Sequence, residues 1–208
     1  IFMNSMKNIV KALCTLLALI LILPACSAGS GESSGESSEK LLPITINGTE
    51  IRIGETTVQA LLDQGMNVGW VDENYERVDV DPSMELEPNA YYTGGSINVS
   101  ENVFAHISFV TEDKAVPLGE AVIARLEFSL VGEEDKSVLE KIAFDGVPIT
   151  ELTREKAGEM YPDWTGDEVM WLKYGLEYKY DLNFDMTSGQ MTKFSASREY
   201  DVDWNGGD

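Results

Sequence analysis

The sequence predicts an α+β domain made of two degenerate repeats, each with a β-hairpin, a short helix and antiparallel strands. Asn47-Gly48 and Asp145-Gly146 are strong hairpin-turn dipeptides, and each lies between short runs of alternating apolar residues, 98 positions apart. Residues 122–130, apart from Ile123, and residues 178–184 alternate between apolar and polar side chains. That alternation is typical of sheets with one buried and one solvated face.

The first repeat is placed at residues 40–137 and opens with the hairpin around Asn47-Gly48. We expect a short helix next, with Thr56 as its N-cap and Gln59, three residues later, completing a capping box. Gly65 suits the position just past the end of that helix. Two unrelated turns are the alternative to a duplication, because Asn-Gly and Asp-Gly turns are common.

The strand over 122–130 is expected to bury one set of side chains and expose the other. Its pattern predicts that Ile123 lies on the face opposite the buried set, which is Val122, Ala124, Leu126, Phe128 and Leu130.

The second repeat is placed at residues 138–208. A helix is expected to begin near Thr153 and to end before Pro162. The strand over 178–184 should pair with the segment after the turn at 186–189, so that the repeat closes with an antiparallel pair. The segment after residue 200 is acidic and is expected to be a frayed tail.

Residues 1–25 have the properties of an export signal. Lys7 and Lys11 precede a short apolar run, 12–23, and no acidic residue precedes Cys26. The run is too short for a comfortable membrane span. Leu23-Pro24-Ala25-Cys26 resembles the bacterial lipobox, in which the cysteine becomes the lipidated first residue. The resemblance implies a palmitate-type diacyl anchor on Cys26 and a place on the extracytoplasmic face of the cell membrane. The alternative is an ordinary signal peptide cleaved elsewhere.

The anchor is followed by a Gly/Ser/Glu tract, so residues 26–39 are predicted to be a lipidated cysteine and a flexible linker. A tract of this length spans roughly 20 Å. Cys14 and Cys26 are the only cysteines, so the folded part has no disulfide and no thiol nucleophile. His106, the only histidine, lies in an alternating strand pattern, and we expect a half-exposed strand residue rather than a catalytic base.

Charge excludes one class of partner. The leader holds two of the fifteen basic residues and none of the thirty-six acidic ones, so the exported part carries a net charge of −23. This charge argues against nucleic acid as a partner. It favours solubility, a cation or a basic partner.

Two acidic regions are candidate calcium sites, since carboxylate and amide oxygens are hard ligands. Asp201, Asp203 and Asn205 follow the opening spacing of an EF-hand loop, although the closing glutamate is missing. The segment 71–89 is also rich in acids, but its spacing matches no loop motif, and a solvated acidic loop is the alternative.

Aromatic and paired acidic residues give the other candidates. Trp164 and Trp171 lie in a predicted loop and could form a binding surface for sugar or peptide. Glu85 and Glu87 could support a carboxylate-dependent hydrolase acting on envelope glycans. No nucleophile elbow, phosphate loop or metal cluster accompanies them, so no catalytic residue is assigned.

The paired Asn-Gly and Asp-Gly hairpins, the short capped helices and the closing antiparallel sheet resemble uncharacterised clostridial-type lipoproteins. They are also loosely similar to the tandem α+β repeat of β-lactamase-inhibitor-protein-like folds. This resemblance implies a fold and no activity. We therefore expect an exported, lipid-anchored, non-catalytic domain that binds a protein or a cell-wall component.

Overall fold

The computed structural model describes residues 41–205, except for residues 73, 102, 131–135, 164–165, 167 and 175–176. The chain divides into two compact units, Ile1–Ser37 and Ser38–Asp208, and every described residue belongs to the second. The predicted signal peptide, the anchor at Cys26, the linker and Trp164 therefore lie outside the described residues.

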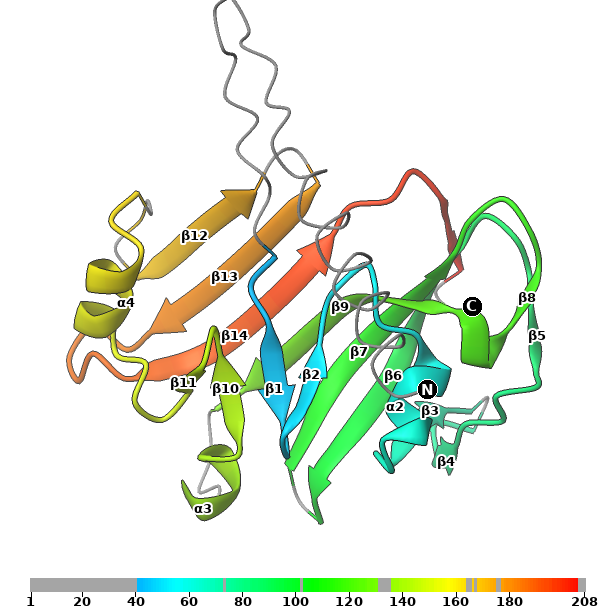
Figure 1. Ribbon diagram of the computed structural model, residues 1–208, viewed down its shortest axis with the longest axis horizontal. Coiled ribbons are helices and arrows are strands. Elements are labelled where there is room, and N and C mark those ends of the chain that lie inside the picture. The colour runs from blue at the N-terminus through cyan, green and yellow to red at the C-terminus, as the bar shows by residue number, and fades with distance from the viewer. Residues whose placement is uncertain are drawn as a thin grey trace, which may run out of the picture. The chain divides into compact units, whose positions relative to one another are not determined.

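A small four-stranded sheet forms the front layer in Figure 1. Its strands run in the order β11-β10-β1-β2 and are β1 (Ile44–Ile46), β2 (Thr49–Ile51), β10 (Ile142–Phe144) and β11 (Val147–Pro148). Both predicted hairpins are confirmed, because all four turn residues have positive φ, with values of 50° and 84° at Asn47 and Gly48 and of 46° and 81° at Asp145 and Gly146. Two consecutive residues with positive φ give the turn the twist of the strands that it joins.

A larger sheet forms the layer behind, in the order β12-β13-β14-β9-β7-β6-β3-β4, with β15 paired to β6. All of its printed pairs are antiparallel except β15 with β6. Its strands are β3 (Val68–Val71), β4 (Arg77–Asp79), β6 (Ala90–Ser100), β7 (Val103–Thr111), β9 (Val122–Ser129), β12 (Val169–Tyr174), β13 (Tyr178–Phe184), β14 (Met191–Arg198) and β15 (Asp203–Asn205).

Short helices flank the small sheet, with α4 (Arg154–Met160) beyond β11 and α2 (Val58–Asp63) beyond β2 (Figure 1). The remaining elements are α3 (Lys136–Leu139), the single-turn η1 (Leu118–Glu120) and the two-residue strands β5 (Glu85–Leu86) and β8 (Val116–Pro117). Mostly antiparallel sheet with a few short helices confirms the α+β prediction at this level. The described residues contain no cysteine and so no disulfide.

The N-terminal caps of the helices differ from the prediction in α2 and agree with it in α4. The cap of α2 is Thr57 rather than Thr56, because the Thr57 hydroxyl accepts a hydrogen bond from the Ala60 amide. Thr56 instead accepts one from the Arg52 amide, within the turn that precedes the helix. Thr153 caps α4 as expected, and its hydroxyl accepts a hydrogen bond from the Lys156 amide. Gly65, with a φ of 76°, follows α2 as expected.

The predicted faces of β9 are wrong at Ile123, which is fully buried. The register between β7 and β9 shifts there, since Arg125 is opposite Ser108 whereas Ile123 is opposite Phe109. Ala124 is therefore the extra residue of a β-bulge, and a bulge reverses the alternation of side chains. Both Ile123 and Leu126 consequently lie in the core.

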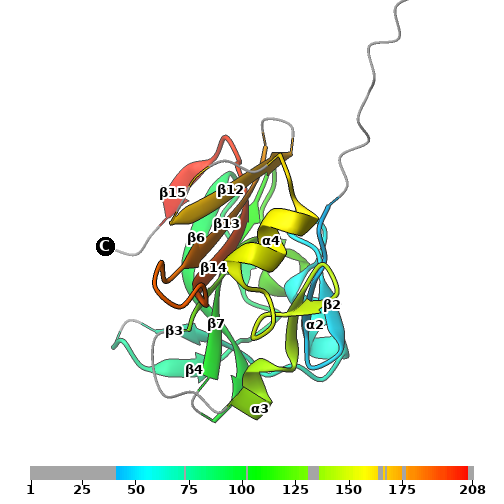
Figure 2. The same ribbon diagram turned by 90° about the vertical axis from the view of Figure 1, so that its left-hand side faces the viewer.

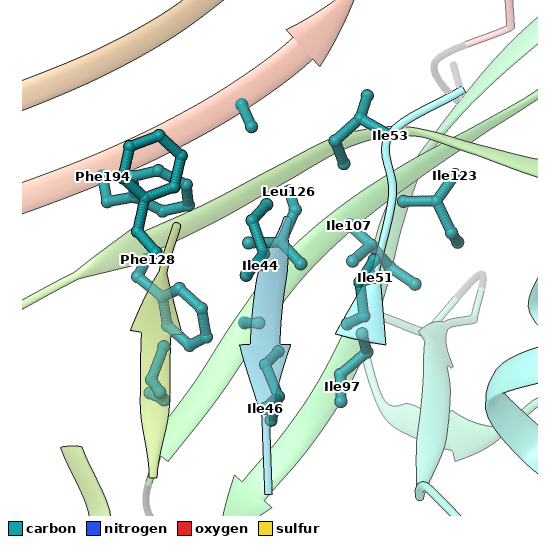
Figure 3. Packing of buried hydrophobic residues seen from close by; sticks show 14 of the residues in the cluster. Ile44, Ile46, Ile51, Ile53, Ile97, Ile107, Ile123, Leu126, Phe128 and Phe194 are labelled. Carbon is teal, nitrogen blue, oxygen red and sulfur yellow. The ribbon is translucent and has the colours of Figure 1, made fainter. Parts of the chain in front are cut away.

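The hydrophobic core lies between the two sheets. Seen from the side, the small sheet and the helices cover one face of the large sheet (Figure 2). Figure 3 shows isoleucines of the small sheet, such as Ile44 and Ile46, opposite Leu126 and Phe128 of β9. Phe144 joins three parts of the molecule, because its ring centroid lies 6.1 Å from that of Tyr161 after α4 and 5.1 Å from that of Phe194 in β14.

This packing predicts a large loss of stability when Phe144 is truncated. Phe144→Ala should lower the free energy of unfolding by about 3–5 kcal/mol, because it leaves a cavity between the layers. Phe104→Ala is the control, since Phe104 is 37% exposed and should cost about 1 kcal/mol or less. Urea denaturation of both variants checks this, and equal losses would contradict the layer arrangement.

Candidate functional site

The face of the large sheet that points away from the small sheet is the candidate site, and we call it the open face. Its side chains alternate along each strand with those of the core, as the burial of β13 shows, where every second residue is buried. His106 and Arg125 are exposed on it, and Glu127 and Lys193 are half-buried. This layer is therefore apolar on the inside and polar on the outside.

A continuous row of residues crosses the open face from one strand to the next. Each member is paired in register with the next one, and the row spans eight strands. Opposed residues of antiparallel strands generally have Cβ atoms within about 4.5–5.5 Å of each other, so the described side chains of the row, from Asp79 to Asp181, act as one surface. In order, the row is Asp79, Gly69, Ser96, His106, Glu127, Ser195, Asp181 and Trp171.

Glu127, near the centre of the row, forms ion pairs with two cationic side chains. Its carboxylate lies 2.5 Å from an Arg125 guanidinium nitrogen and 2.9 Å from Lys193 Nζ. Partial burial acts to raise the pKa of Glu127, but the hydrogen bonds from Lys193 and Arg125 outweigh it, so this pKa lies below its ordinary value. The glutamate stays ionised at neutral pH and fixes both cations, which makes it a poor proton donor.

Asp181 forms a second polar group on the same face. One carboxylate oxygen, Oδ2, lies 3.0 Å from Lys179 Nζ and accepts a hydrogen bond of 3.3 Å from the Ser195 hydroxyl. The other oxygen, Oδ1, is buried and has no hydrogen-bond partner among the described residues. The open face thus carries ion pairs and hydroxyls in fixed positions, which suits the recognition of a polar ligand.

A shallow depression of about 270 Å³ lies on the open face over β6, β7 and β9. It includes a bulge in β6 at Thr93-Gly94, where the register with β7 shifts between Tyr92 and Gly95. The depression is lined by Tyr91, Thr93, Gly94, Gly95, His106, Ile107, Ser108, Arg125 and Glu127.

A second hollow of about 420 Å³ lies at the end of β7 and β14 and is lined in part by Arg198 and Tyr200. The Arg198 guanidinium lies over the rings of Tyr178 and Tyr200, at 5.5 and 4.9 Å from their centroids, and pairs with Glu177 at 3.0 Å. Burial raises the pKa of Tyr200, so its hydroxyl remains protonated and donates or accepts hydrogen bonds. The hollow lies at the ends of strands rather than across the middle of the sheet, so it is a weaker candidate than the open face.

The predicted calcium residues are only partly described. Asp203 begins β15 and Asn205 ends it, and this strand pairs with β6. The prediction that this segment is a frayed tail is therefore wrong. The Asp203 carboxylate accepts a hydrogen bond of 3.0 Å from the Asn89 side chain. Among the described residues, no three His, Cys, Asp or Glu side chains gather in a way that could hold a metal. A calcium site at Asp201, Asp203 and Asn205 stays a prediction.

The other candidate residues from the sequence lie in different elements of the fold. Trp171 is in strand β12 rather than in a loop, and its backbone is paired with that of Asp181 in the open-face row. Glu85 in β5 and Glu87 just after it are both exposed. His106 is the exposed strand residue that the alternating pattern predicts.

No family model matches the sequence, and searches among curated proteins and solved structures gave no match. Within the described part of the chain, no helix is long and apolar enough to span a membrane.

Sequence reasoning missed Arg125, Glu127, Asp181 and Lys193 as a group. Each occupies a polar position in an alternating strand and, taken alone, looks like an ordinary solvated residue. The sequence indicates this group only by charged residues that occupy the polar positions of several alternating strands. That signal has no meaning until the order and register of the strands are known.

The ion pairs of Glu127 predict a pH-dependent contribution to stability. Because its folded pKa is lowered, the contribution is present above the ordinary value of 4.5 and is lost as the pH falls through the folded pKa. Glu127→Gln should cost about 0.5–1 kcal/mol at pH 7, and the difference from wild type should shrink in acid. Glu55→Gln, an exposed control, should show no such trend in urea denaturation from pH 7 to pH 3. A loss that is constant with pH would contradict this role.

Proposed function

We propose that this protein is an exported, lipid-anchored surface protein whose folded domain is a non-catalytic binding module. The open face is its binding surface, and a polar polymer of the cell wall is its ligand. The observation that carries the proposal is the row of fixed polar groups from Ser96 to Asp181 across the sheet. A protein ligand bound elsewhere on the domain is compatible with the same anchor.

The polarity of the open face favours a wall polymer over a protein as its ligand. The central parts of protein–protein interfaces are depleted in charged residues and enriched in aromatic ones. The open face instead carries Arg125, Glu127, Asp181 and Lys193, with hydroxyls between them. Fixed hydrogen-bonding groups and a shallow depression suit the hydroxyls and amides of a polysaccharide chain.

The export signal and Cys26 support the proposed location. A two-chain lipid anchor gives stable attachment, and the Gly/Ser/Glu tract after it acts as a tether. A tether that holds the domain roughly 20 Å from the membrane keeps it beside the wall. The proposed partners are thus the membrane, through the lipid, and the wall, through the open face.

The hydrolase that acts on envelope glycans is the weaker proposal. A general acid needs a raised pKa, whereas the pKa of Glu127 is lowered by its cations. Glu85 and Glu87 are exposed and line neither of the two hollows.

We also propose that the domain is a tandem duplication, as the sequence predicts. The register of the small sheet supports this, because Thr45 is opposite Ala143 and these two residues are equivalent at the offset of 98 between the two turns. The strand order supports it in part. From the centre outward the small sheet reads β1-β2 on one side and β10-β11 on the other, and the large sheet reads β9-β7-β6 and β14-β13-β12, whereas β3 and β4 have no counterpart among the described strands of the second repeat. A local two-fold axis through both sheets would produce that order.

The anchor predicts that Cys26→Ser releases the protein from the membrane, because the lipid has no other attachment point. Cys14→Ser is the matched control and should leave the protein in the membrane fraction, since Cys14 lies in the cleaved leader. Fractionation followed by intact-mass analysis checks both variants. An unmodified Cys26 in the membrane-bound protein would rule out this anchor.

The open face predicts binding of the soluble 38–208 fragment to purified cell walls. The double variant Arg125→Ala/Lys193→Ala should lower the affinity at least tenfold, because it removes the cations that Glu127 holds in place. The matched control, Lys141→Ala/Lys156→Ala, removes the same charge from exposed positions elsewhere and should bind normally. Co-sedimentation with the purified cell walls measures the affinity of the wild-type fragment and of both double variants.

Trp171→Ala extends this test to the end of the row. We expect weaker wall binding with an unchanged melting temperature, whereas collapse of the fold would identify Trp171 as a core residue. An equal loss of affinity in the Lys141→Ala/Lys156→Ala control would overturn the wall-binding proposal. The absence of binding by the wild-type fragment would overturn it as well.

A further inference from the structure

A row of cationic and hydroxyl side chains runs beside the open-face row, two residues away along each strand. It crosses β7, β9, β14 and β13, which lie side by side in Figure 1, and each member is paired in register with the next. We call it the cationic row, and its members are Ser108, Arg125, Ser197 and Lys179. The backbone pairing continues to Lys173 in β12. No acidic residue interrupts this row.

The charge at the middle of the open face is opposite to that of the whole chain, which carries a formal net charge of −21. The ion pairs there join three cations, Arg125, Lys179 and Lys193, to two carboxylates. The carboxylates belong to Glu127 and Asp181, so three positive and two negative charges leave a net charge of +1. A local excess of positive charge on an acidic protein indicates an anionic ligand for this face.

The carboxylates hold the cations in place and leave most of their donors unused. One guanidinium nitrogen of Arg125 contacts Glu127, and Lys179 Nζ contacts Asp181 at 3.0 Å. A guanidinium has five N–H donors and an ammonium group has three. The side chains of Arg125 and Lys179 are 46% and 38% exposed, so a ligand can reach their remaining donors.

The depression over β6, β7 and β9 lies at one end of the cationic row. Ser108 and Arg125 line it together with Thr93 and His106, so four side chains that can donate hydrogen bonds border one volume of about 270 Å³. Hydroxyl and guanidinium donors around one volume suit the oxygens of a tetrahedral phosphate group. The Glu127 carboxylate also lines the depression, but its two cations offset its charge.

The spacing of the cations favours a polymer over a single small anion. Strand β14 lies between Arg125 in β9 and Lys179 in β13, so their backbones are about 10 Å apart. The serines of the row alternate with these cations from strand to strand. A chain with an anion in every repeat contacts both cations in one binding event, and the second contact adds affinity as an intramolecular step.

We propose that the cationic row and the depression bind the phosphate groups of a phosphodiester-linked polymer of the cell wall. The polymer lies across the strands, where Arg125 and Lys179 pair with its phosphates. The hydroxyls of Ser108 and Ser197 donate hydrogen bonds to phosphate oxygens between the two cations. This inference rests on the proposed wall binding and specifies the class of the ligand.

The first experiment compares purified cell walls before and after treatment with hydrofluoric acid, which hydrolyses phosphodiester bonds and leaves the glycan. The 38–208 fragment contains every described residue and should bind the untreated walls at least tenfold more tightly in co-sedimentation. Equal binding to both preparations would overturn the phosphodiester ligand and leave the wall-binding proposal standing. Binding to neither preparation would overturn the wall-binding proposal itself.

The second experiment titrates the same fragment with a synthetic oligomer of glycerol phosphodiesters and with an oligogalacturonate of equal net charge. We expect tighter binding of the phosphodiester oligomer, with an affinity that falls as salt screens its charges. Lys179→Gln should lower this affinity about tenfold, because it removes a charged hydrogen bond. Lys141→Gln removes the same charge from an exposed position before β10 and should bind normally.

The melting temperatures of both variants should stay close to that of the wild type, since a partly exposed ion pair adds little stability. Equal affinity for the two oligomers would overturn the assignment of a phosphate ligand. Equal losses in Lys179→Gln and Lys141→Gln, or no binding of the phosphodiester oligomer by the wild-type fragment, would overturn the role of the cationic row.

Discussion

The pairing of β1 with β10 is the constraint on which the rest of the structure depends. It joins segments almost a hundred residues apart, with Ile44 opposite Phe144 and Ile46 opposite Ile142. The four strands of the small sheet are only two or three residues long, and such a sheet is stable only when packed on another layer. The large sheet supplies that layer, and the core of this cysteine-free domain lies between the two.

This arrangement uses one face of the large sheet for stability and leaves the other face uncovered by the small sheet. The inner side chains are fixed by packing, so they hold the strands and the open-face row in register. The ion pairs of Glu127 and Asp181 add little to stability because they are partly exposed. Their value lies in holding polar groups at set positions on a rigid sheet.

Local features of the fold could be predicted from the sequence, whereas features that depend on distant pairing could not. The Asn47-Gly48 turn and the cap at Thr153 follow from the preferences of a few adjacent residues. The bulge at Ala124 and the pairing of β15 with β6 depend on the partner strand. The open-face row is of the second kind, because its members come from eight strands.

The most direct test of the open face is to map the ligand by NMR. Amide and side-chain shifts of the 38–208 fragment would be followed while soluble cell-wall fragments are added. We predict shifts centred on His106, Arg125, Glu127 and Lys193, with the core residues of β1 and β10 unchanged. Shifts confined to the small sheet and the helices, or no shifts at saturating ligand, would contradict the account.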